Sequence, residues 1–163
     1  MTWNLTQRLL STLVGAALVA APLAAQFPPI VANDNRIPAG AGVQNGVLTL
    51  NLEITKGVWH PESETGEAMG VYAFGEPGKK LQIPGPTLRV PQGTIMDVTV
   101  RSNVDVPATI HGMHSRPGND SDVVIIEPRK THHFRFEAGV PGTYLYWAVT
   151  PDGERGDRRV VDS

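Results

Sequence analysis

The chain has 163 residues, with 14 lysines and arginines against 16 aspartates and glutamates, and it contains no cysteine. A formal net charge of −2 with scattered basic residues argues against a nucleic-acid or anionic-membrane surface, because such surfaces need clustered Lys and Arg. The lack of cysteine excludes disulfides, thiolate metal sites such as the blue-copper site, and cysteine nucleophiles.

The N-terminal segment has the pattern of a secretory signal peptide. Arg8 precedes an uncharged apolar run over residues 9–23, and alanines follow at 24–25. A membrane anchor needs roughly 20 apolar residues in a row, whereas this run is shorter and is broken by a glycine and a proline. We therefore expect residues 1–25 to be a signal peptide and the mature chain to be periplasmic or secreted, without membrane attachment after cleavage.

The rest of the chain divides into a leader and one domain. Residues 26–43 are rich in Pro, Gly and Asn, so we expect a flexible leader there. Residues 44–163 are long enough to bury a hydrophobic core of their own, and no window in them keeps a helical apolar period.

Short strand-like runs separated by turn formers fill this domain. In chain order they are VLTLNLEIT (47–55), MGVYAFGE (69–76), TLRV (87–90), TIMDVTVRS (94–102), VPATIH (106–111), DVVII (122–126), THHFRFEA (131–138) and TYLYWAV (143–149). Seven or eight short strands of this kind predict an all-β sandwich or barrel.

Alternation within the strands indicates the core. Along THHFRFEA, His132, Phe134 and Phe136 share one face, and the phenylalanines make that face the inner one. Within TYLYWAV the period alone does not decide which face is inner. The core residues that we expect are Val98, Val100, Ile110, Phe134, Phe136 and Tyr144.

Residues 109–118 read TIHGMHSRPG and contain two histidines three positions apart, His111 and His114. Imidazoles suit copper and zinc in nitrogen-donor sites. On a continuing strand the two rings would point to opposite faces, whereas a turn at Gly112 would let them converge. The alternative reading is a partly buried histidine at a strand end and a surface histidine in a loop, since a stable metal site normally needs three or four ligands.

The other candidate groups favour structural readings. His132 and His133 are adjacent on a strand and indicate a surface pair, and His60 lies in a loop with several carboxylates. Asp120 and Asp122 are typical of an Asx-rich turn. No nucleophile elbow, P-loop, His-Glu-x-x-His or dinucleotide-binding motif occurs, so we assign no catalytic residue.

Several short sequence motifs follow one another in an order that is typical of a known family. They are Gly85-Pro86-Thr87 before a strand, Gly93 in the turn into TIMDVTV, Asn103 closing that strand, the TIH approach at 109–111, and AGVPGTY before the last strand. Together they resemble the first plastocyanin-like (cupredoxin) domain of the multicopper oxidase, laccase-like family. The resemblance runs from about Gly46 to the C-terminus and implies a cupredoxin-like Greek-key β-sandwich.

The resemblance also implies a metal position. The family carries two His-x-His pairs that contribute to a trinuclear copper cluster shared with its last domain. Here His111 matches the first ligand, Met113 the second with His114 one residue later, and Trp147 and Val149 match the second pair. The resemblance thus implies a divergent branch whose share of the copper site is lost or altered. His111 and His114 are the candidate metal ligands, for copper that is bound weakly or shared with another domain.

Three hypotheses follow for function. In the first, the chain is an exported fragment or subunit of a copper-dependent oxidoreductase, with further cupredoxin domains or copies of itself as partners. It is then inactive alone, because it has neither a type 1 copper cysteine nor a complete histidine cluster. In the second, it is a stand-alone periplasmic module that binds copper or another protein, and in the third a structural β-sandwich without a ligand. A neighbouring reading frame with histidine-rich strands and a His-Cys-His stretch would favour the first.

Overall fold

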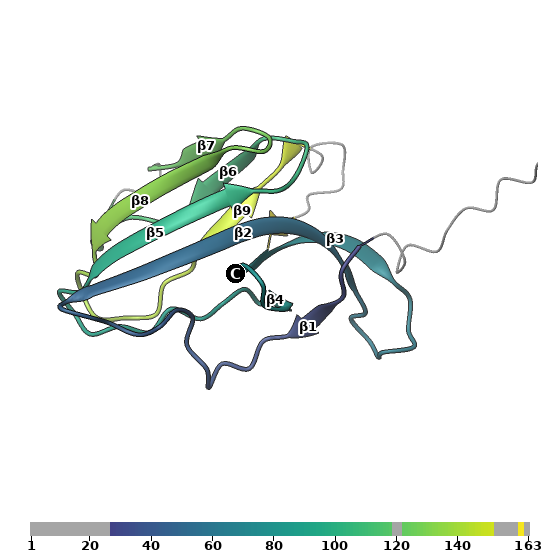
Figure 1. Cartoon of the computed structure of the whole chain (residues 1–163), viewed down its shortest axis with the longest axis horizontal. Helices are drawn as coiled ribbons and strands as arrows, with labels where there is room; N and C mark the ends of the chain where they lie inside the picture. The colour runs from purple at the N-terminus through teal and green to yellow at the C-terminus, as the bar shows by residue number, and fades with distance from the viewer. Residues whose placement is uncertain (1–26, 119–121, 152–159, 162–163) are drawn as a thin grey trace, which may run out of the picture.

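The computed structural model describes residues 27–118, 122–151 and 160–161 (Figure 1). The expected signal peptide, residues 1–25, lies outside these ranges. Within them, no helix is long and apolar enough to cross a membrane. The strands are β1 (Ile30–Ala32), β2 (Val47–Trp59), β3 (Met69–Gly75), β4 (Leu81–Ile83), β5 (Ile95–Ser102), β6 (Ala108–His111), β7 (Val124–Ile126), β8 (Thr131–Glu137), β9 (Trp147–Val149) and β10 (Val160–Val161).

Two four-stranded sheets form the sandwich. One has the order β3-β2-β5-β8 and is called the β5 sheet below, and the other has the order β10-β9-β6-β7 and is called the β6 sheet. Figure 1 shows β8, β5, β2 and β3 running side by side across the molecule, with β6, β7 and β9 in the second layer. Within the β5 sheet, β2 pairs with β5 in parallel and the other neighbours are antiparallel. This is the cupredoxin-like Greek-key β-sandwich that the sequence predicts.

The core lies between the sheets because apolar residues alternate along their strands. Its central members are Leu48, Leu50, Leu52 and Ile54 of β2, Met96, Val98 and Val100 of β5, Ile110 of β6 and Ala148 of β9. Val98, Val100, Ile110 and Phe134 are buried as expected, and Phe136 packs against them while partly buried.

Tyr144 is not in the core, which corrects one expectation. Its side chain is 47% exposed, and its hydroxyl donates a hydrogen bond to the carbonyl of Val140 four residues earlier. The core tyrosine is Tyr146, whose hydroxyl donates to the carbonyl of Pro86 at 2.7 Å and whose ring packs edge-on against Phe74. The reason is that residues 143–146 form no strand, so Tyr144 bends back onto its own turn.

The segment TLRV is also not a strand, because its neighbours come from the N-terminal segment. The carbonyl of Thr87 accepts a bond from the Ala39 amide, and the Thr87 hydroxyl contacts the side chains of Asn33 and Asn35. The short strand in this region is β4 instead, six residues earlier.

The described part of the expected leader is structured. Strand β1 pairs in parallel with β4, and the Val58 amide donates to the carbonyl of Pro28. Ile30 and Leu81 bury each other in a small second core, and Ile30 lies so close to Gly57 that a Cβ on that glycine would approach it to 2.6 Å. Few apolar residues carry these contacts, so residues 27–43 showed no period that predicts them.

Candidate metal centre

The histidine segment begins at the end of β6. His111 is the last residue of that strand, and Gly112 turns the chain with a φ of 77°. A Cβ on Gly112 would lie 2.1 Å from the backbone oxygen of Leu145, so the position requires glycine both for its dihedral angle and for space. The turn at Gly112 that the sequence allowed is therefore present.

His111 lies flat against an aromatic ring. Strand register places it opposite Trp147 of β9, and the two rings are parallel, with an interplanar angle of 1° and centroids 4.8 Å apart. The same register places Val149 opposite Thr109. Because an indole only donates a hydrogen bond and valine has no polar side-chain atom, the strand facing His111 offers no metal donor.

The His114 ring is held by the backbone of the next residue. Its Nδ1 lies 3.0 Å from the carbonyl oxygen of Ser115, which fits an Nδ1–H donor and leaves the lone pair on Nε2. Metal-binding imidazoles are commonly oriented by such a bond on their other nitrogen. Yet Nε2 is buried and has no hydrogen-bond partner among the described residues. A metal can reach this nitrogen only when the loop opens.

Core packing and one neighbouring segment hold the loop in place. Met113, at a ligand position of the resemblance, is 7% exposed and belongs to the core. The Val140 amide donates to the carbonyl of Arg116, and the Arg116 guanidinium lies 5.2 Å from the centre of the Tyr144 ring. A Cβ on Gly139 would meet the same Arg116 carbonyl at 1.9 Å. The loop before β9 is thus packed tightly against the histidine segment.

The remaining histidines do not join this site. His60 Nδ1 contacts the Gly66 carbonyl, and His132 packs edge-on against Phe134. Asp120 lies outside the described residues, and Asp122 is exposed. Among the residues that the structure describes, no group of three or more His, Cys, Asp or Glu is placed to hold a metal. The donors present therefore do not fit a complete copper site.

His133 belongs to an ionic cluster on the β5 sheet. Its Nε2 lies 2.5 Å from one carboxylate oxygen of Asp97, and Arg135 donates to the other oxygen at 2.8 Å. The hydrogen bond from His133 is the main reason that the pKa of Asp97 falls below its ordinary value, and the charges of His133 and Arg135 add to the effect. The side chains of His133 and Arg135 are both more than half exposed, so this cluster ties β5 to β8 and forms no enclosed site.

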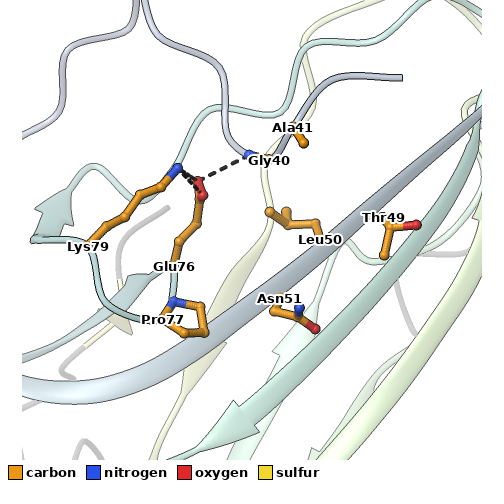
Figure 2. A pocket seen from close by; sticks show the side chains of 8 residues that line it. All are labelled: Gly40, Ala41, Thr49, Leu50, Asn51, Glu76, Pro77 and Lys79. Carbon is orange, nitrogen blue, oxygen red and sulfur yellow. Dashed lines mark hydrogen bonds and ion pairs between the residues drawn. The ribbon is translucent and has the colours of Figure 1, made fainter. Parts of the chain in front are cut away.

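A shallow depression lies elsewhere on the surface. It has a volume of about 390 Å³, and no described residue of the 109–118 segment lines it. Figure 2 shows that the Glu76 carboxylate in its wall is already engaged by the Lys79 ammonium and the Gly40 amide. These contacts join two turns of the same chain, which gives the depression a structural explanation.

Comparison with known proteins supports the copper-protein resemblance. A family model described as multicopper oxidase matches residues 80–158. Among solved structures, the chain is similar to a multicopper oxidase from Campylobacter jejuni, described as a metallo-oxidase, with a TM-score of 0.52 and 22% identity over 76% of this chain. It is also similar to a laccase from Pediococcus acidilactici Pa5930, with a TM-score of 0.48 and 14% identity over 76% of this chain.

The match covers only part of those proteins. The chain spans 26% of the Campylobacter jejuni oxidase and 24% of the Pediococcus acidilactici laccase. No curated protein sequence matches it.

Proposed function

This chain folds as a cupredoxin-like domain of the multicopper oxidase type, and on that premise we propose that it acts as an exported part of a copper-dependent oxidoreductase. Other cupredoxin domains supply most of the metal ligands, so the chain is not competent by itself. The observation that carries the proposal is the ladder between β6 and β9. There His111 keeps a ligand position but faces Trp147, while no cysteine exists for a type 1 copper.

His111 and His114 are the proposed metal contacts. Two imidazoles leave a copper ion short of protein ligands, so water must complete its coordination shell. The buried Nε2 of His114 adds the free energy of opening the loop to the cost of binding. Affinity for Cu(II) is therefore weak, with a Kd above ~1 μM, or less than about 8 kcal/mol of binding free energy.

Calorimetric titration of the mature chain with Cu(II) tests these contacts. We expect weak binding that His111→Ala abolishes and His114→Ala reduces, with His132→Ala as the matched control that leaves it unchanged. Tight stoichiometric binding, or binding that survives both loop substitutions, would show that the site is misplaced or underestimated.

The lack of catalytic competence has its own test. Oxygen consumption by the copper-loaded mature chain with a reducing substrate should stay at the rate of free copper at the same concentration. Turnover above that background, with dependence on the protein concentration, would contradict the proposal, because this chain has no cysteine for an electron-accepting type 1 site.

Export is tested by the mass of the secreted protein. We expect an N-terminus near Gln26, because the small residues at 24–25 follow an apolar segment. A product that retains Met1 and stays with the membrane would rule out cleavage.

A second candidate function is a stand-alone interaction module. It is favoured by one observation, the apolar outer side of the β6 sheet, where Ile125 is 60% exposed. A partner protein or domain with a His-Cys-His stretch encoded beside this chain favours the oxidoreductase, and its absence favours the module.

A further inference from the structure

One ring nitrogen of His114 is buried without a partner. Its Nε2 has no hydrogen-bond partner among the described residues, although His114 lies in the connection between β6 and β7. A buried polar group that lacks a partner costs free energy, so such a group in a folded protein needs an explanation. A metal contact has to expose this nitrogen, whereas the fold hides it.

The backbone of the same connection covers the imidazole ring. Residues 114–118 are called the histidine loop below. The His114 ring lies against Gly118, because a Cβ on that glycine would come within 2.3 Å of Nδ1 and 2.8 Å of Cε1. The same Nδ1 lies 3.0 Å from the Ser115 carbonyl oxygen. The ring is therefore folded into the loop, and residue 118 must be glycine for the loop to close over it.

The end of β8 and the connection that follows it hold the loop closed. The Val140 amide donates to the Arg116 carbonyl at 3.0 Å. Gly139 lies so close to that carbonyl that a Cβ on it would approach the oxygen to 1.9 Å. The Glu137 amide donates to the Ser115 hydroxyl at 3.1 Å. Two consecutive residues of the histidine loop are thus fixed by one neighbouring segment.

The contacts that hold the loop are exposed, so their loss leaves the sandwich core intact. Ser115 is exposed, and the Tyr144 ring, 5.2 Å from the Arg116 guanidinium, is 47% exposed. Hydrogen bonds and cation–π contacts at exposed sites each stabilise a closed loop only slightly. The unpaired nitrogen of His114 counts against the closed form, because opening gives it water. Local opening of the loop should therefore need much less free energy than global unfolding.

We propose that the histidine loop is an autoinhibitory latch. Its closed form withholds the His114 imidazole from any ligand, and its open form presents it while Met113 stays in the core and the sandwich stays folded. Because only open molecules offer the imidazole, the affinity of a ligand for His114 is reduced by the fraction that is open. The inference deepens the proposed function and rests on it in taking His114 as a metal contact, but the opening itself requires no metal.

Diethylpyrocarbonate tests the latch without any metal, because it modifies accessible neutral imidazole nitrogens. Peptide mass spectrometry of the mature chain gives the rate at each histidine. In the wild type we expect His114 to react at least about tenfold more slowly than the exposed His132, since the reaction waits for the loop to open. Urea below the unfolding transition should change the His114 rate little, because a local opening exposes little surface.

Gly118→Ala should open the latch. The new Cβ takes the place of the ring edge, and the end of a side chain moves more readily than the backbone does. The His114 rate should then rise at least about threefold, toward that of His132. Gly139→Ala, whose Cβ meets the Arg116 carbonyl, should raise the rate as well.

Gly78→Ala is the matched control. Gly78 has a positive φ of 76°, and a Cβ there would meet nothing within 4 Å, so this substitution lowers stability without contacting the histidine loop. Its His114 rate should equal that of the wild type. Circular dichroism should show all three alanine variants folded.

Several results would overturn the latch. They are a wild-type His114 that reacts as fast as His132, a His114 rate that follows global unfolding in urea, and rates in Gly118→Ala and Gly139→Ala that equal the wild-type rate. An equal rise in Gly78→Ala would overturn it too, since lost stability alone would then explain the reaction. The wild-type rates decide the proposal even where a variant fails to fold. None of these results depends on Cu(II), so the copper titration decides the proposed function separately.

Discussion

The two sheets both have apolar inner faces, but their outer faces differ in polarity. On the β5 sheet, the register places Thr49, Asp97 and Arg135 in one outward row. The next outward row there contains Asn51, Thr99 and His133. On the β6 sheet the outward rows contain valine, isoleucine and tryptophan, with His111 stacked on the indole.

Solubility alone explains the outer residues of the β5 sheet but not those of the β6 sheet. The outer residues of the β5 sheet are polar, and Asp97 pairs with His133 and Arg135 among them, which is enough to explain them. Those of the β6 sheet find no such explanation, and they coincide with the strands to which the family resemblance assigns copper ligands. The β6 sheet is therefore the side of the molecule where function is expected.

Substitution of the turn glycines should give the largest difference in stability between the two sheets. Gly112 after β6 and Gly93 before β5 both have positive φ, at 77° and 82°. Only Gly112 is also in close contact, since a Cβ on Gly93 would meet nothing within 4 Å. Gly112→Ala should therefore lower the free energy of unfolding by about 3 kcal/mol, and Gly93→Ala by about 1 kcal/mol. Urea unfolding of both variants measures this, and equal losses would mean that the contact with Leu145 is not tight.

The two tyrosines before β9 give an intermediate effect. Burial, and to a smaller extent the charge of Glu76, raises the pKa of Tyr146 above its ordinary value, consistent with a neutral hydroxyl that donates to Pro86. Tyr146→Phe leaves that buried carbonyl without its partner and should cost about 1–2 kcal/mol. Tyr144→Phe removes an exposed bond and should cost less than about 0.5 kcal/mol. Thermal unfolding of the two variants decides, and a larger loss at Tyr144 would contradict the assignment of the core tyrosine.

The ionic cluster of the β5 sheet gives the smallest effect. A pKa that is lowered in the folded state means that the Asp97 carboxylate stabilises the fold above its ordinary pKa, and that this contribution disappears as the pH falls through the folded pKa. Asp97→Asn should therefore be slightly less stable than the wild type at neutral pH and equal to it in strong acid. High salt should shrink the difference, because the partners are exposed. A difference that grows on acidification would have the wrong sign.

Strand patterns predicted an all-β sandwich or barrel because the long strands of the β5 sheet alternate between apolar and polar residues, and the family resemblance added the cupredoxin-like topology. The same patterns missed β1 and β4, because each has only three residues and stands among prolines and other turn-forming residues, and they joined residues 143–146 to β9. The misplacement of Tyr144 follows directly, because alternation fixes a face only where the chain is extended.

The candidate site was less predictable. His111 and the turn at Gly112 could be expected from residues 109–118. The stacking of His111 on Trp147 depends on the register between β6 and β9, which local sequence does not encode. The exposed Ile125 could have been noticed from the odd alternation in DVVII, where two adjacent isoleucines must point to opposite faces.

Weak copper binding at His111 is tested most directly by quenching of Trp147 fluorescence by Cu(II), because the centroids of the two rings lie 4.8 Å apart. In a mature chain with Trp59→Phe, Trp147 is the only tryptophan. We expect saturable quenching with a midpoint above ~1 μM copper, lost on His111→Ala and unchanged on His132→Ala. Stoichiometric quenching at lower copper, or quenching that His111→Ala leaves intact, would contradict it.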